Sequence, residues 1–209
     1  MKEKVKENVE KVLPLLLKEF PNKDWNWFGV SSNPNITLEF VKEHPKFPWC
    51  YMGLSLNPNI TLEFVKENTI NWCWKRISSN QGITLKDIKD NPVLPWDYSG
   101  LSLNPNITLE FVKENIRENW CWWSISNNPC ISLDLVKENP TLPWEWGALT
   151  SNPSITFKQV KENPSFPWYY PALSSNPNVS FHQIKESPNI NWRFESDLSH
   201  NKFKKHWVY

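Results

Sequence analysis

The sequence is poor in glycine, has no long apolar run and carries almost no net charge. Its 23 basic and 22 acidic side chains give a formal net charge of +1, which creates no general attraction to nucleic acid, an anionic membrane or an acidic substrate. No stretch reaches the roughly 18 uncharged apolar residues that span a bilayer, and the N-terminal residues lack a signal-peptide apolar core. We therefore expect a soluble, intracellular protein without a membrane contact.

Residue types that support catalysis or metal binding are also sparse. The four cysteines form no Cys-x-x-Cys pair and no zinc-finger spacing with histidine. Equivalent cysteines of neighbouring repeats should lie about 10 Å apart, beyond the reach of a disulfide, so we expect reduced thiols. The five glycines form no phosphate-binding loop, and the four histidines lie in unlike contexts. The sequence therefore predicts a protein that is not an enzyme and holds no cofactor.

Tryptophan, in contrast, is abundant and regularly spaced. One tryptophan recurs every 24 residues, with a single interval of 23, at Trp25, Trp49, Trp72, Trp96, Trp120, Trp144, Trp168 and Trp192. A Ser or Thr followed two positions later by Asn recurs in step with it, at Ser31/Asn33, Ser55/Asn57, Ser78/Asn80, Ser102/Asn104, Ser126/Asn128, Thr150/Asn152, Ser174/Asn176 and Ser199/Asn201. We name these sets the tryptophan ladder and the Ser-x-Asn ladder. Repetition with a period of about 20 to 50 residues indicates stacked supersecondary units, so the whole chain is interpreted as a repeat array.

The first half of each repeat has the features of a short amphipathic helix. In one repeat Thr61 suits an N-cap, and Ile60, Phe64 and Val65 fall on one face at 100° per residue. The same cap position is occupied by Thr37, Thr84, Thr108, Ser132, Thr156 and Ser180. A proline should end the helix about two turns later, at Pro45, Pro92, Pro140, Pro164 and Pro188.

The second half of each repeat predicts another short helix. Its buried face is assigned to an aromatic residue two positions after the ladder tryptophan and an aliphatic residue three positions further on, at Trp27/Val30, Tyr51/Leu54, Trp74/Ile77, Tyr98/Leu101, Trp122/Ile125, Trp146/Leu149 and Tyr170/Leu173, with Phe194 as the last aromatic. A proline directly before the ladder tryptophan suits the first turn of this helix, at Pro48, Pro95, Pro143 and Pro167. The helix should end at the ladder asparagine, whose amide can bond nearby backbone groups.

Two interpretations of the ladder tryptophans are possible. Helical phase alone places them opposite the second aromatic, as an exposed series on which bases or sugars could stack. The favoured reading places them in a non-helical entry segment, folded into the groove between repeats, because eight exposed tryptophans would make an unusual apolar surface.

The fold class that follows is all-α, a superhelical solenoid of 24-residue repeats with two short helices each. We assign residues 1–20 to N-terminal capping helices, 21–198 to about eight repeats and 199–209 to a C-terminal cap or tail. The Lys-acid pairs from Lys42-Glu43 to Lys185-Glu186 form adjacent stripes of opposite sign. These stripes are a solvated face or, alternatively, a register for a partner with matching charges.

Candidate binding residues come from positions that break the repeat. Residues three places after the ladder tryptophan point away from the buried face, and residues one place after it lie at its flank. Both positions vary freely, so they are either neutral surface or elements that recognise a partner. We take as candidate partner-binding residues Phe28, Met52, Trp123, Tyr169 and Arg193.

The run from Leu54 to Thr61, with Val65-Lys66-Glu67-Asn68, resembles the Asn-Pro-Asn-Ile-Thr repeat proteins that giant DNA viruses encode in many copies. The resemblance covers nearly the whole chain and implies a viral protein, in the host cytoplasm or the virion. The chain departs from the pattern at Gln81-Gly82, and at Thr69 and Ile116, where a proline is usual. The period and the Asn-Pro turns are also similar to the leucine-rich variant repeat, which implies that the second helix is α or 3₁₀.

These observations favour a non-enzymatic scaffold that presents an extended surface to a protein partner, from the host or from the virus. A modular binder of single-stranded nucleic acid is an alternative hypothesis, although the charge balance argues against nucleic acid. A structural component that self-assembles in the virion is another. The sequence does not distinguish among oligomeric states.

Overall fold

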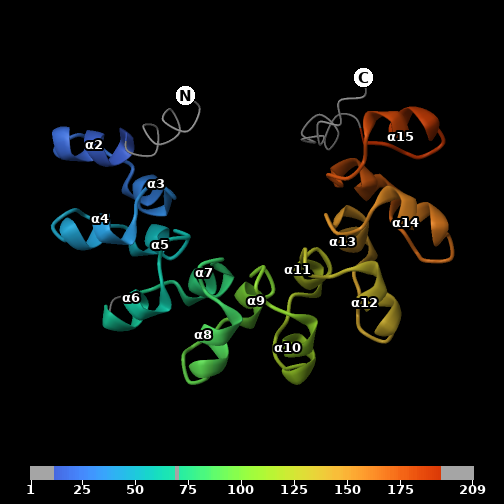
Figure 1. Cartoon of the computed structure of the whole chain (residues 1–209), viewed down its shortest axis with the longest axis horizontal. Helices are drawn as coiled ribbons and strands as arrows, with labels where there is room; N and C mark the ends of the chain where they lie inside the picture. Colours follow the sequence, from blue (N-terminus) through green and yellow to red (C-terminus); the bar gives the residue numbers. More distant parts are fainter. Residues whose placement is uncertain (1–11, 69–70, 194–209) are drawn as a thin grey trace, which may run out of the picture. The chain divides into compact units, whose positions relative to one another are not determined.

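The computed structural model describes residues 12–68 and 71–193. All regular secondary structure in these residues is helical, fourteen short α-helices and one 3₁₀-helix (Figure 1). The helices are α2 (Val12–Glu19), α3 (Trp27–Ser32), α4 (Leu38–Glu43), α5 (Tyr51–Leu54), α6 (Leu62–Glu67), α7 (Trp74–Ser79), α8 (Leu85–Asp90), α9 (Tyr98–Leu101), α10 (Leu109–Glu114), α11 (Trp122–Ser126), α12 (Leu133–Glu138), α13 (Trp146–Ser151), α14 (Phe157–Glu162), η1 (Tyr170–Ser175) and α15 (Phe181–Glu186). The predicted fold class, an all-α solenoid of 24-residue repeats, is confirmed.

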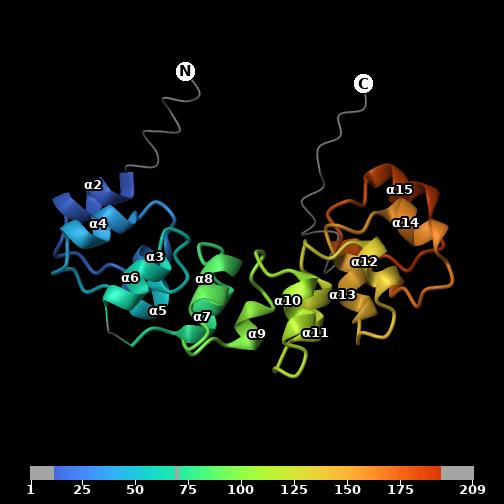
Figure 2. The same cartoon turned by 60° about the horizontal axis from the view of Figure 1, so that its bottom comes forward.

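Contacts group the chain into two units, residues 1–106 (unit 1) and 107–209 (unit 2). In unit 1 the first helices of successive repeats, α4, α6 and α8, form one row, and the second helices, α3, α5, α7 and α9, form another (Figures 1 and 2). Unit 2 has the same two rows, with α10, α12, α14 and α15 as first helices and α11, α13 and η1 as second helices. The single 3₁₀-helix, η1, carries Pro171 in its first turn.

The first helices begin and end where the sequence predicts. The hydroxyl of Thr61 accepts a hydrogen bond from the backbone N–H of Phe64 at 3.4 Å, and the other six first helices have the equivalent Thr or Ser cap. In α4 the helix ends at Glu43, and the C-cap residue His44 precedes Pro45. The apolar face is buried as expected, with Ile60, Phe64 and Val65 each less than a tenth exposed.

The second helices begin later than predicted. They start three residues after Pro48, Pro95, Pro143 and Pro167, so the assignment of these prolines to a first helical turn is wrong. Each proline is instead the central residue of a tight turn, in which the N–H of the ladder tryptophan donates to the carbonyl two residues earlier, as in Trp49 to Phe47 at 2.8 Å. The fixed φ of proline fits such an inverse γ-turn.

The core combines aliphatic and aromatic ladders. The predicted aliphatic positions, from Val30 to Leu173, are all buried. The second aromatics are only half-buried, and Tyr170 is exposed, so the predicted burial of this face is confirmed for its aliphatic residues and only in part for its aromatic residues. Five of these rings pack edge-on against the ladder tryptophan of the next repeat, as in Trp27 with Trp49 at 5.5 Å and Trp146 with Trp168 at 5.2 Å between ring centres. Phe194 lies outside the described residues.

The Ser-x-Asn ladder joins neighbouring repeats. The hydroxyl of Ser31 accepts from the backbone N–H of Cys50 at 3.0 Å, one repeat later. The Nδ2 of Asn57 donates to three carbonyls of the preceding repeat, those of Ser31, Asn33 and Ile36, each at 3.0 Å. The Oδ1 atom of Asn57 accepts from the N–H of Asn59 at 2.9 Å, which is the local turn that the sequence predicts. The buried amide therefore satisfies backbone groups of two repeats at once.

Little of the predicted capping segments can be compared. Leu17 of α2 is buried, and Pro14 lies in the first turn of that helix. Residues 1–11 of the expected N-terminal cap and all of the expected cap or tail at 199–209 lie outside the described residues. The division into cap, repeats and tail stays a prediction. None of the helices in the described residues has both the length and the apolar character to cross a membrane.

Candidate binding surfaces

Three of the five candidate residues, Trp123, Tyr169 and Arg193, lie in unit 2 and form contacts there with one another or with the same glycine. Trp123 on α11 is 56% exposed and Tyr169, at the N-cap of η1, is 46% exposed. The Cζ atom of Arg193 lies 5.6 Å from the centre of the Tyr169 ring, and its Nη2 donates to Tyr169 Oη at 2.7 Å. A Cβ on Gly147 would lie 3.2 Å from Trp123 Cζ3 and 3.8 Å from Tyr169 Cδ1, so both rings border the bare backbone of that glycine. We name Trp123, Gly147, Tyr169 and Arg193 the aromatic surface.

The local structure explains why these rings are exposed. Trp123 precedes the buried Ile125 by two residues, which places the two side chains about 200° apart around α11. The backbone N–H groups of Tyr169 and Arg193 are held by the hydroxyls of Thr150 and Ser174, at 3.1 and 2.8 Å. The Ser-x-Asn ladder thus fixes the backbone of this surface and leaves its side chains open to solvent.

The other two candidates, Phe28 and Met52, lie in unit 1 on α3 and α5. They are 40% and 50% exposed, as expected for residues that point away from the core. Arg76 Cζ lies 5.7 Å from the centre of the Phe28 ring. The five predicted residues therefore belong to two sets, one in each unit. Sequence reasoning missed Arg76 and Gly147, although Gly147 occupies one of the variable positions.

The tryptophan ladder is not an exposed stacking series. Six of the eight indoles are buried, and Trp25 and Trp96 are half-buried, as the favoured reading predicted. In all eight repeats the indole Nε1–H donates to a carbonyl at the end of the preceding helix, as in Trp144 to Asn139 at 2.8 Å and Trp49 to His44 at 2.9 Å. The ladder therefore gives each of these C-terminal carbonyls an indole donor, and most of the carbonyls also accept a backbone N–H from three residues later, as in Leu142 to Asn139.

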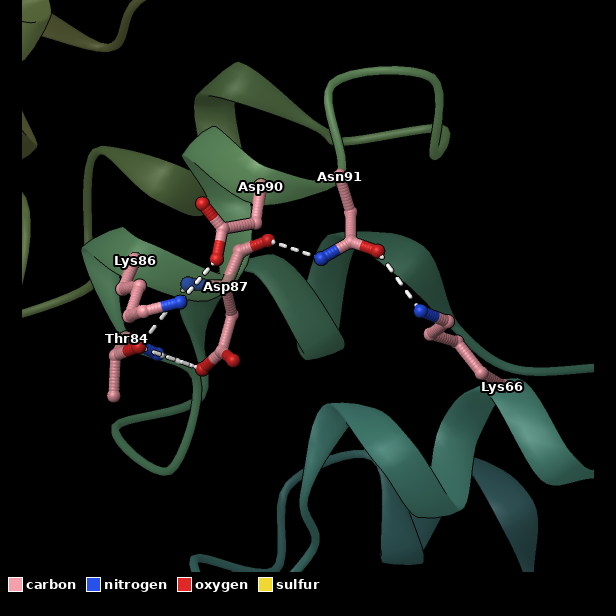
Figure 3. Close-up of polar contacts among 6 residues, drawn as sticks. All are labelled: Lys66, Thr84, Lys86, Asp87, Asp90 and Asn91. Atoms are coloured by element: carbon pink, nitrogen blue, oxygen red, sulfur yellow. Dashed lines mark hydrogen bonds and ion pairs between the residues drawn. The ribbon is translucent and has the colours of Figure 1, made fainter.

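The charged stripe on the first helices is tied together by polar contacts between neighbouring repeats (Figure 3). Lys66 Nζ on α6 donates to Asn91 Oδ1 at 3.0 Å, and Asn91 Nδ2 donates to the Asp87 carbonyl at 2.8 Å. Lys86 pairs with Asp90 within α8, and this bond raises the pKa of the Lys86 ammonium. Most of these side chains are solvent-exposed, so each pair contributes little to stability.

Each unit also contains a pocket at the same place in the repeat, where a first helix meets the following connector. The unit 1 pocket, about 310 Å³ in volume, is lined by Val41, Lys42, Pro45, Trp49, Tyr51, Phe64, Glu67 and Asn68. The unit 2 pocket, about 280 Å³, is lined by Val136, Lys137, Pro140, Leu142, Pro143, Trp144, Trp146 and Phe166. Five lining positions correspond through the repeat, beginning with Val41 and Val136. These pockets were not predicted from the sequence, since they form between repeats.

The cysteines are free thiols, as the sequence predicts. Cys130 Sγ donates to the carbonyl of Ile107 at 3.0 Å, and burial, with a smaller effect from the Glu110 charge, raises the pKa of this thiol. Within residues 12–68 and 71–193, no three His, Cys, Asp or Glu side chains are grouped so as to hold a metal ion. No protein-family model matches the chain, and neither the curated proteins nor the solved structures yield a similar protein.

Proposed function

We propose that this protein is a non-enzymatic scaffold that binds a protein partner, from the host or the virus, through the solvent-exposed side of its second helices. The aromatic surface of unit 2 carries this proposal. Trp, Tyr and Arg are the residue types that contribute most binding energy at protein interfaces. Here one of each lies in a row in which Tyr169 and Arg193 hold each other by a hydrogen bond. A surface fixed in this way loses little side-chain freedom when a partner binds.

The same surface has no role in the hydrophobic core. Trp123 and Tyr169 remain about half exposed, whereas the ladder tryptophans are used in packing and helix capping. The burial of that ladder also favours a protein partner over single-stranded nucleic acid, because bases stack on exposed rings. Balanced charge supports the same choice, since a nucleic-acid groove requires an excess of Lys and Arg along the strand.

The test begins by capturing a partner from extracts of the cells that produce this protein and purifying it. Calorimetry then compares the wild type with Trp123→Ser and Tyr169→Ser. We expect each substitution to weaken binding by about 30-fold or more, the loss of about 2 kcal/mol that defines an interface hot spot. Phe181→Ser is the matched control, because Phe181 is an aromatic residue of unit 2 that is 75% exposed on a first helix.

Equal affinity of the wild type and both variants would refute the proposed surface. A gel-shift series with single-stranded RNA and DNA at low salt tests the alternative hypothesis. Tight binding of either strand would refute the choice of a protein partner.

A further inference from the structure

The unit 2 pocket combines an apolar lining with a single charge. Of the residues that line it, Lys137 alone is ionisable, and the others are aliphatic, proline or aromatic. The Trp146 ring forms one wall and lies 5.1 Å from the Phe166 ring centre. Trp144 is held by its bond to the Asn139 carbonyl, so the floor of the pocket is fixed before any ligand arrives. A pocket of about 280 Å³ is near the lower end of the range for small-molecule sites, and it suits one large side chain.

Lys137 differs from three of the lysines at the same position of other repeats, Lys42, Lys66 and Lys113. Lys66 and Lys113 each donate to an asparagine of the next repeat, Asn91 at 3.0 Å and Asn139 at 2.9 Å. Lys42 lies 3.8 Å from Glu67. Lys137 makes no ion pair, hydrogen bond or cation–π contact with the part of the chain that the structure describes, and it is exposed. The charge at the mouth of the unit 2 pocket is therefore unneutralised.

In the unit 1 pocket the charge of the equivalent lysine, Lys42, is neutralised. Its lining includes both Lys42 and Glu67, the two members of the ion pair. The Lys42 Nζ also lies 5.7 Å from the centre of the Phe64 ring. A negative group that approached this pocket would have to compete with Glu67. The two pockets thus share the apolar part of their design and differ in charge.

We propose that the unit 2 pocket binds an acidic peptide segment, with an apolar side chain packed against the Trp146 and Phe166 rings and a neighbouring carboxylate paired with Lys137. The apolar side chain gains from leaving water, and the carboxylate gains from a cation beside an apolar wall, where water screens the pair less than on an open surface. This site is separate from the aromatic surface, so its failure would leave the proposed scaffold function untouched.

The direct test uses the full chain labelled with ¹⁵N on its indole groups. The probe is the synthetic peptide acetyl-Gly-Asp-Phe-Glu-Gly-amide, and the control peptide replaces Asp, Phe and Glu with Asn, Ser and Gln. The Trp144 and Trp146 resonances are assigned from spectra of Trp144→Phe and Trp146→Phe. We expect the acidic peptide to shift these two resonances saturably and the control peptide to leave them in place. Absence of a shift at millimolar peptide, or shifts confined to other indoles, would overturn the proposal.

Lysine substitutions test the charge. Lys137→Gln should weaken binding of the acidic peptide by about 3- to 10-fold, somewhat more than an exposed ion pair usually contributes. Lys158→Gln is the matched control, because it removes a charge from α14 without touching the lining. Equal weakening by both variants, or by neither, would contradict the role assigned to Lys137.

The unit 1 pocket supplies a gain-of-binding test. Glu67→Gln removes the carboxylate that neutralises Lys42, so the acidic peptide should then also shift the Trp49 resonance. The wild-type Trp49 resonance should stay in place under the same conditions. If the acidic peptide shifts Trp49 equally in the wild type and in Glu67→Gln, an unpaired lysine is not what selects the ligand.

Discussion

Units 1 and 2 have the same skeleton but different surfaces. Both place an asparagine amide under the carbonyls of the preceding repeat, as Asn57 does in unit 1 and Asn152 in unit 2. Their outward side chains differ, since unit 1 presents Phe28 and Met52 and unit 2 presents Trp123 and Tyr169. Their pockets differ in three lining residues and in the ion pair that neutralises the lysine of unit 1. A repeat protein can thus keep its fold constant while single residues at variable positions give each unit its own binding chemistry.

The largest expected effect tests whether the two skeletons are equivalent. Asn57→Ala and Asn152→Ala should each lower the free energy of unfolding by about 3 kcal/mol, because each removes a buried amide that bonds two or three carbonyls of the preceding repeat, and losing the partner of a buried polar group costs about 1–3 kcal/mol. Denaturant titration followed by circular dichroism measures this loss. Asn59→Ala is the control, since Asn59 is half-buried at the neighbouring position, and it should cost about 1 kcal/mol. A loss in only one unit would show that the ladders are not equivalent.

A smaller loss of stability is expected when alanine replaces a glycine of a second helix, and its size shows how tightly that helix packs against its neighbours. A Cβ on Gly53 would lie 2.7 Å from the Phe28 carbonyl oxygen, which is backbone and cannot rotate away. Gly53→Ala should therefore lower the free energy of unfolding by about 2 kcal/mol, as overpacked sites do.

Gly147→Ala in unit 2 provides the contrast. There the Cβ would meet the outer edge of the Trp123 ring at 3.2 Å, and that ring is exposed and can move. We expect a stability change within about 1 kcal/mol, partly offset by the better helix propensity of alanine. Thermal unfolding of both variants measures the difference, and equal losses would contradict the assigned packing.

The smallest effect concerns Cys130, which occupies the position of Asn59 in the repeat. Because the folded state raises the pKa of this thiol, its contribution to stability is complete below the pKa of the unfolded thiol, about 8.5. Above that pH the unfolded chain loses the proton first, so the free energy of unfolding should fall as pH rises through the folded pKa. Cys130→Ser keeps a donor for the Ile107 carbonyl and does not titrate.

Unfolding curves of the wild type and Cys130→Ser at pH 7 and pH 10 measure this difference. The wild type should lose slightly more stability than the variant between these two values. An identical loss would show that Cys130 is not the titrating group.

The local elements were predictable because their signals are local. Thr61 and its equivalents cap the first helices as the sequence indicates, and Pro45 marks where α4 has ended. The assignment of Pro48 to a helix was wrong, because proline suits both a first helical turn and the centre of a γ-turn. Only the backbone bond from Trp49 to Phe47 distinguishes the two.

The candidate surfaces were predictable only in part. The variable positions correctly identified exposed side chains such as Trp123 and Tyr169. They did not show that Gly147 lies between those two rings, because that contact involves three repeats. Lys137 was equally hidden, since the same Val-Lys-Glu sequence surrounds Lys113, which does have a partner. Whether a lysine is paired depends on the geometry of the next repeat.

The sequence by itself determined the period, the two helices of each repeat and the burial of the aliphatic ladder. These features depend on side-chain spacing along a helix and on caps and breakers, which act over a few residues. The tertiary structure alone decided which carbonyls the ladder asparagines satisfy, and which lysine stays unpaired beside an apolar pocket. Those outcomes arise between groups about 24 residues apart, where stacking sets the distances and the sequence pattern is the same whether or not a contact forms.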